Sequence, residues 1–451
     1  MQDWGGAPIP RGEAVMMPQV FRSLRNRNFR LWSIGAVVSN TGTWFQRIAQ
    51  DWLVLTQLTD HRASAVGIVM ALQAAPTILL LPYTGAAADR LDRRKLLMVT
   101  QASQALLALV LGILAIENAI ALWGVYVIAF LFGCATAFDS PARHTFASDL
   151  VGEDDIANAV ALNSTSFNMA RLVGPAVAGA VIAATGVGWA FLINGASFVA
   201  VLFSLFFLRT GELHPQTRST RKSMQLLGGF RYIRQRPELA TVMLMTFFIG
   251  TFGLNFPIFI STMSASVFHT GAARYGLLMS IMALGSLGGA LFAAHHSAPS
   301  IRSLTISATI FGAGLFVAGL SPTFWIFGAT LTIVGGASVS FTTATSSFMQ
   351  LVTEQAMRGR VASIRLAVGL GGTLIGGPIM GAIADRLGPR TSVVLGAASG
   401  FVAALLAIQH LSRERRLRRA PVAEDIAHPL NCDDTVQSAG GVALPDDRNP
   451  A

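Results

Sequence analysis

Apolar stretches long enough to cross a bilayer recur along the chain, separated mostly by short polar connections. One helical crossing needs about 20 mainly apolar residues. Twelve stretches meet this length: 30–57, 64–88, 95–116, 121–142, 161–185, 188–209, 238–266, 272–294, 301–320, 323–346, 361–384 and 389–411. The pattern therefore predicts an all-α integral membrane protein with twelve transmembrane helices.

The longest internal polar interruption, from Thr210 to Pro237, divides these spans into six and six. Met224–Arg234 within it is either a short amphipathic helix on the membrane surface or part of a solvated linker. Low hydrophobicity after residue 420 predicts disorder. The predicted parts are a cytoplasmic N-terminal segment (1–29), two six-helix bundles (30–209 and 238–411), a cytoplasmic central loop (210–237) and a basic, then disordered, cytoplasmic tail (412–451).

The two halves are related in sequence. The segment "EDDIANAVA" (153–161) aligns with "EQAMRGRVA" (354–362), and "GPAVAGAVIAATG" (174–186) aligns with "GPIMGAIADRLG" (377–388). The offset stays near 200 residues in both matches. Together with the twelve spans, this indicates a parallel duplication that produces two pseudo-symmetric bundles.

Composition agrees with a membrane location. Hydrophobic residues make up 52% of the 451 residues and charged residues 12%, against about a quarter charged in soluble proteins. Of the 33 lysines and arginines, 26 fall in the segments that would be cytoplasmic and four in the outer loops. The positive-inside rule then predicts that both termini lie in the cytoplasm, and we expect the protein in the inner (plasma) membrane. The net charge of +10 reflects this orientation and does not indicate nucleic-acid binding.

The sequence offers little for catalysis or for metal binding. It has no phosphate-binding GxxxxGK[ST] loop, and its two cysteines, Cys134 and Cys432, form neither a disulfide framework nor a ligand cluster. The first 30 residues lack the apolar core of a cleavable signal peptide. We therefore expect no enzymatic activity, no cofactor and no metal.

The first span contains an unusual polar strip, "NTGTWFQRIAQDWLVL" (40–55). Arg47 and Asp51 are four residues apart and share a helix face, with Gln50 beside them. Ionisable residues within spans usually face a bundle interior or a watery cavity. Two interpretations remain open: the strip lines a cavity and Asp51 exchanges a proton, or Arg47 and Asp51 form a permanent salt bridge.

Three further polar residues lie within predicted spans: Asn168 and Arg171 in the fifth and Arg365 in the eleventh. With the strip of the first span, they are the candidates for a cavity or coupling site. Three arginines in one cavity would suit an anionic or polar substrate.

The loop after the second span, "GAAADRLDRRK" (85–95), resembles the GxxxDRxGxRR signature of the major facilitator superfamily, with Asp92 where a glycine is usual. The resemblance implies a cytoplasmic gate in which Asp89 faces a helix N-terminus or a basic group of the other half. An aspartate at a helix end beside ordinary positive-inside charges is the alternative. The gate candidates are Gly85, Asp89, Arg90, Arg93, Arg94 and Asp139, and Arg93 or Arg94 is expected within about 4 Å of Asp139.

A second copy of this motif, "GAIADRLGPR" (381–390), lies between spans 11 and 12. The repeat alignment matches it to the loop between spans 5 and 6, which places it on the outer side. It is therefore not expected to act as a gate of the same kind.

Gly174 and Pro175 in span 5, and Gly377 and Pro378 in span 11, predict close helix packing with local bending. The first pair resembles part of the antiporter signature of drug exporters. The motifs "FDSPARHTFASDLV", "ANAVALNS" and "INGASF" resemble the subgroup of enterobactin exporters and macrolide efflux proteins.

That resemblance implies proton-coupled export of amphiphilic small molecules, of drug or siderophore type, by alternating access. The expected partners are the small-molecule substrate, protons and the lipid bilayer, and the chain is expected to be a monomer. An importer or facilitator of the same fold, or a non-transporting membrane sensor or scaffold, remains an alternative. A transporter predicts a central cavity lined by spans 1, 4, 7 and 10.

Overall fold

A computed structural model of the chain describes residues 20–214, 226–295 and 299–419. Within these ranges the regular structure is helical and contains no strand, so the predicted all-α fold is confirmed. The predicted disorder after residue 420 and most of the N-terminal segment lie outside the described residues. Residues 1–410 group as one compact unit, which contains both predicted bundles except the end of the last span, and residues 411–451 group as another.

The helices of the first half follow the predicted spans. They are η1 (Arg22–Arg25), α2 (Arg27–Trp52) with the π-helical turn η2 (Leu53–Leu58), α3 (Ala63–Leu79), α4 (Leu81–Arg90), α5 (Arg93–Ile116), α6 (Leu122–Asp149), η3 (Glu153–Asp155), α7 (Ile156–Thr185), α8 (Val187–Phe206) and η4 (Thr210–Glu212). Local signals set several starts: Asn26 caps α2 through the backbone N–H groups of Asn28 and Phe29, and Asp92 caps α5 through that of Lys95.

The second half repeats this order. It contains α9 (Leu226–Gln235), α10 (Pro237–Phe248), η5 (Ile249–Gly253), α11 (Phe256–Thr262), η6 (Met263–Val267), α12 (Ala272–His295), α13 (Ile301–Leu320), α14 (Phe324–Val352), α15 (Arg358–Leu387) and α16 (Pro389–Arg419). The segments η5 and η6 are π-helical and interrupt the seventh span, as η2 ends the first. Helix α9 confirms the short helix considered in the central loop, and its position on a membrane surface stays a prediction.

Ten helices in the described part are long and apolar enough to cross a membrane. The other two predicted spans correspond to α2, which contains the polar strip, and to the pair α3 and α4. The break at Leu80 precedes Pro82, which cannot donate a backbone hydrogen bond. Twelve spans in two sets of six agree with the predicted fold.

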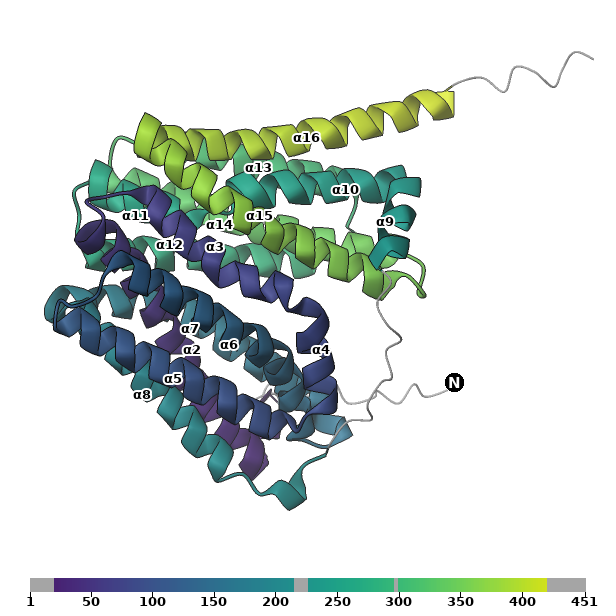
Figure 1. The fold of residues 1–451 in the computed structure, drawn as a ribbon. Helices are drawn as coiled ribbons and strands as arrows, with labels where there is room; N and C mark the ends of the chain where they lie inside the picture. Colours follow the sequence, from purple (N-terminus) through teal and green to yellow (C-terminus); the bar gives the residue numbers. More distant parts are fainter. Residues whose placement is uncertain (1–19, 215–225, 296–298, 420–451) are drawn as a thin grey trace, which may run out of the picture. The chain divides into compact units, whose positions relative to one another are not determined.

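Most helices pack within their own half, and two pairs make the most extensive contacts between the halves. In the first half α2 packs on α7 and α8, and α5 on α6 and α8; in the second, α14 packs on α12 and α13. The pairs α3–α15 and α7–α12 cross between the halves. Figure 1 shows α3 running beside the helices of the second half. The second span therefore contacts the eleventh, and the fifth contacts the eighth, so each contacts the counterpart of the other.

Gly285 provides a test of packing within the second half. A Cβ atom there would lie 1.9 Å from the carbonyl oxygen of Thr332 on α14, whereas a Cβ atom at Gly288 would meet nothing within 4 Å. We expect Gly285→Val to lower the stability of the folded protein by about 1–3 kcal/mol or more, because backbone must move. Gly288→Val is the matched control. Thermal unfolding of the purified variants in detergent measures this, and equal stability would contradict it.

Candidate functional site

The glutamines of the polar strip face the interior of the first half. Gln46 accepts a hydrogen bond from Asn194 of α8 at 3.1 Å and donates to Gln50 at 3.4 Å. Gln50 also accepts from Gln73 of α3 at 3.1 Å. All except Gln73 are at most 1% exposed. Gln50, expected to line a cavity, thus belongs to a buried amide network that ties α2 to its neighbours.

Asp51 instead contacts the second half. Its side chain accepts a hydrogen bond from the hydroxyl of Tyr275 on α12 at 2.9 Å. Asp51 is 8% exposed and Tyr275 is fully buried. The Tyr275 ring also stacks on Trp52, with 5.9 Å between the ring centroids. One helix turn of α2 therefore joins the halves through a carboxylate and two aromatic rings.

Arg47 does not form a closed ion pair with Asp51. The ion pairs found among the described residues do not include these two. Arg47 is exposed, and its guanidinium lies 5.0 Å from the ring centroid of Trp44. Its charge still interacts with Asp51 and with Arg171. The permanent salt bridge considered from the sequence is not the geometry of this structure.

The other intramembrane candidates occupy different environments. Arg171 is half-buried and donates to the hydroxyl of Ser286 on α12 at 3.4 Å. Because Ser286 lies eleven residues after Tyr275, the two contacts are about 16 Å apart along α12. Asn168 is exposed and bonds within its own helix, to the carbonyl of Ser164. Arg365 is half-buried on α15.

Both glycine–proline elements lie where the halves meet. A Cβ atom at Gly276 of α12 would lie 2.1 Å from the carbonyl oxygen of Pro175, and one at Gly67 of α3 would lie 2.2 Å from that of Gly377. The backbone N–H of Ala176 donates to the hydroxyl of Ser280 on α12 at 3.0 Å. The duplicated element thus permits backbone contact between α7 and α12 and between α15 and α3. Gly174 itself packs against the side chain of Trp44. Pro378 follows Gly377 in α15 and lies beside the contact with Gly67.

The second motif copy bridges the halves. The carboxylate of Asp385, near the end of α15, accepts from the backbone N–H groups of Ala63 at 2.6 Å and Ser64 at 3.1 Å. These groups belong to the first turn of α3, where N–H groups lack helical partners and the helix dipole favours a negative charge. No pattern in the sequence predicted this contact. We call the end of the bundle where α3 begins and α15 ends the latched end.

The first motif anchors helices within the first half. Arg93 pairs with Asp149, at the end of α6, at 2.7 Å. Arg94 donates to the carbonyls of Leu205 and Phe206, at the end of α8. Both contacts fix the beginning of α5 against neighbouring helix ends.

The prediction that Arg93 or Arg94 pairs with Asp139 was wrong. Asp139 pairs with Arg143 of its own helix at 2.9 Å and accepts from Thr100 and Gln101. The reason is that α6 runs to Asp149, beyond the predicted limit of residue 142. The carboxylate beside the start of α5 is therefore about 15 Å further along α6 than Asp139.

Gly85 and Arg90, the other gate candidates that the structure describes, lie in open surroundings. A Cβ atom at Gly85 would meet nothing within 4 Å, so no helix approaches closely at this position. Arg90 is exposed. The side chain of Asp89 lies outside what the structure describes.

Sequence reasoning missed Tyr275, Ser280 and Ser286 on α12 and Asn194 on α8. Polar residues inside predicted spans were the available signal. Their partners are more than 100 positions away in the chain, so periodicity could not identify the pairs.

Comparisons with known proteins agree on one family. The family model described as "Transmembrane secretion effector" (MFS_3) matches residues 19–442. The staphyloferrin A transporter of Staphylococcus aureus is 27% identical over 248 residues, which are 54% of this chain and 62%, less than two thirds, of that protein. The enterobactin exporter EntS of Shigella flexneri is 26% identical over 377 residues, covering 82% and 88% of the two chains.

Solved structures show the same fold at low identity. A bacterial homologue of the human lysosomal transporter Spinster, in an inward-facing and occupied conformation, matches with a TM-score of 0.68 at 14% identity, covering 86% of this chain and 97% of that one. The nucleoside transporter NupG matches with a TM-score of 0.66 at 15% identity, covering 85% and 99%.

The bond between Asp51 and Tyr275 can be tested by Tyr275→Phe, which keeps the ring and its stacking. A buried carboxylate that loses a donor should destabilise the protein by about 1–3 kcal/mol. Thermal unfolding in detergent measures the effect. Tyr126→Phe, at a half-buried tyrosine of α6, is the control. If both variants unfold like the wild type, the bond contributes nothing to stability.

Proposed function

The chain belongs to the transmembrane secretion effector family of the major facilitator superfamily, and we propose that it exports amphiphilic small molecules in exchange for protons by alternating access. Membership of the family makes the chain a multi-pass membrane transporter. Export, proton coupling and the substrate class are the proposed part. The observation that best supports alternating access is the latched end, where Asp385 and the Asp51–Tyr275 bond join the halves.

Alternating access needs contacts that close one side and can be released. We propose that the latched end faces outward, with both termini in the cytoplasm of the inner membrane, as the distribution of positive charge indicates. The predicted halves, 30–209 and 238–411, then rock about α3–α15 and α7–α12. Their backbone contacts at Gly67 and Gly276 would be the pivots of this motion.

The two copies of the loop motif, at 85–95 and 381–390, would act reciprocally. Asp385 at the end of α15 caps the start of α3 in this conformer. In the opposite conformer, Asp89 at the other end of the α3–α4 span would face the start of α15. Gly85, with open space around it here, would then allow the close approach. One helix pair would thus provide both gates.

Siderophore-type anions are the proposed substrates. The staphyloferrin A transporter and the enterobactin exporter are named for siderophores. In this chain Arg47 is exposed and Arg171 and Arg365 are half-buried within the spans. Arginines bind carboxylate and other planar anionic groups through paired hydrogen bonds. An anionic chelator with apolar parts would match these side chains and the surrounding helices.

Protons would couple to transport through Asp51. A hydrogen bond to a carboxylate is stronger than one to the neutral acid. Protonation of Asp51 would therefore weaken its bond to Tyr275. Because an exchanger carries substrate and proton on opposite half-cycles, Asp51 would take up a proton from outside while the latched end is open and the substrate has left. It would release that proton inward when the latched end closes and the bond to Tyr275 forms again.

The deciding experiment measures direction and coupling together. Purified protein in liposomes with an imposed pH gradient is tested against a panel of siderophores and amphiphilic drugs, and cells lacking the gene are tested for siderophore secretion. Export requires substrate movement against the proton flow. Movement with the proton flow would support an importer, and no movement of any compound would favour a sensor or scaffold.

The reciprocal gates predict opposite shifts in accessibility. Asp385→Ala removes a cap worth about 0.5–2 kcal/mol, so a reporter cysteine at Asn168 should label about 2- to 30-fold faster from outside, in a background without native cysteines. Asp89→Asn should instead increase labelling from the cytoplasmic side. Arg386→Ala, at the exposed neighbouring position, is the control. Labelling from outside that does not rise in Asp385→Ala would contradict the outer gate.

Proton coupling predicts a separation of transport from binding. Asp51→Asn should abolish gradient-driven transport and leave substrate binding or exchange largely intact. Arg47→Ala should weaken binding of the anionic substrate more than it weakens coupling. Glu117→Gln, at the exposed end of α5, is a control for charge removal. Full proton-driven export by Asp51→Asn would move the coupling site elsewhere.

A further inference from the structure

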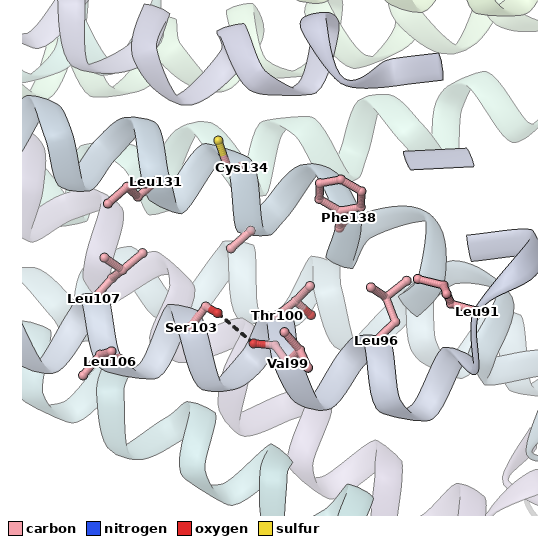
Figure 2. A pocket seen from close by; sticks show the side chains of 11 residues that line it. Leu91, Leu96, Val99, Thr100, Ser103, Leu106, Leu107, Leu131, Cys134 and Phe138 are labelled. Carbon is pink, nitrogen blue, oxygen red and sulfur yellow. Dashed lines mark hydrogen bonds between the residues drawn. The ribbon is translucent and has the colours of Figure 1, made fainter. Parts of the chain in front are cut away.

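A groove on the membrane-spanning surface lies between α5 and α6, outside the site described above. It encloses about 510 Å³. Its lining is mainly apolar and includes Leu96, Val99, Ser103, Cys134, Ala135 and Phe138. Figure 2 shows Leu91 and Leu96 towards one end and Leu106, Leu107 and Leu131 towards the other. The groove therefore follows the helix axes.

Small side chains between large ones explain the space. Ser103 of α5 and Cys134 and Ala135 of α6 leave room between the helices, while Val99 and Phe138 flank it. From Leu96 to Leu107 the groove extends about 16 Å at 1.5 Å per residue. A bilayer has a hydrocarbon core of about 30 Å, so the length of the groove is about the thickness of the hydrocarbon in one leaflet.

The hydroxyl groups of the lining are already occupied. Thr100 donates to Asp139 at 2.8 Å, and Ser103 donates to the carbonyl of Val99 at 2.9 Å, the dashed line in Figure 2. The groove thus offers hydrocarbon contacts rather than partners for water. Such a groove, open to the bilayer, suits an acyl chain.

Positive charge lies at the end where α5 begins. Lys95 is exposed and lies one helix turn before Val99, on the groove side of α5. Arg90, also exposed, precedes Leu91 in the chain. The nearby acids already have partners: Asp92 caps the backbone N–H of Lys95, Asp149 pairs with Arg93, and Asp139 pairs with Arg143. The adjacent Arg94 adds a further positive charge, although its donors bind the end of α8.

We propose that this groove binds one anionic phospholipid, with an acyl chain between α5 and α6 and the phosphate beside Lys95 and Arg90. Anionic headgroups attract juxtamembrane lysines and arginines. A second copy of the chain is the less suitable occupant, because a two-fold contact through this face would bring the same basic residues together. The inference does not depend on the substrate or on proton coupling.

Native mass spectrometry of the full chain, with equal amounts of phosphatidylglycerol and phosphatidylcholine carrying the same acyl chains, tests the proposal. The wild type should retain one phosphatidylglycerol in preference. Lys95→Ala should weaken this binding about fivefold, as expected for one cation near a membrane surface. Ala135→Phe, which fills the groove and keeps the charges, should reduce binding of the lipid further.

Arg302→Ala removes an exposed arginine at the start of α13 and should leave lipid binding unchanged.

A fluorescence experiment covers variants that fold poorly. In liposomes, Phe138→Trp should add fluorescence to that of the seven native tryptophans. Brominated phosphatidylglycerol should quench this added fluorescence more than brominated phosphatidylcholine does. Equal retention of both lipids, equal loss in Arg302→Ala, or a dimer formed through this face would overturn the proposal.

Discussion

Hydrocarbon offers no hydrogen-bond partner, so every polar side chain within a span must find one in the protein or in a watery cavity. Helix α2 meets this constraint on two faces. Gln46 and Gln50 bond with amides of the first half, while Asp51 bonds with Tyr275 of the second. The polar strip therefore holds α2 in its own half and also makes it part of the contact between halves.

The contacts that join the halves differ in kind from those within each half. Within the first half, buried amides and ion pairs such as Arg93–Asp149 fix helices side by side. Between the halves, backbones approach at Gly67 and Gly276, and Asp385 caps α3 from an exposed position. A cap contributes about 0.5–2 kcal/mol, which a ligand with a modest preference for one conformer can overcome. Halves that are fixed internally, joined by backbone contacts and by a cap that a ligand can release, suit alternating access.

The same constraint affects the lipid-facing surface, because a buried carboxylate there takes up a neighbouring hydroxyl group. Asp139, which the sequence suggested as a gate residue, is satisfied by Thr100, Gln101 and Arg143 inside the first half. Because Thr100 turns its hydroxyl to Asp139, the neighbouring groove of α5 and α6 is left apolar. Burial of one carboxylate thus shapes both the core of the bundle and the surface that contacts lipid.

Hydrophobicity, charge distribution and short motifs are local properties, so they sufficed to predict the twelve spans, the duplication, the family and the polar residues that need an explanation. They did not determine the partners of those residues. Asp139 was assigned to the wrong arginines since charged residues extend α6 past its apolar stretch. The contact of Asp385 was not predicted since its partner lies 322 positions away. Helix packing established these pairs, because it brings together residues that no sequence period relates.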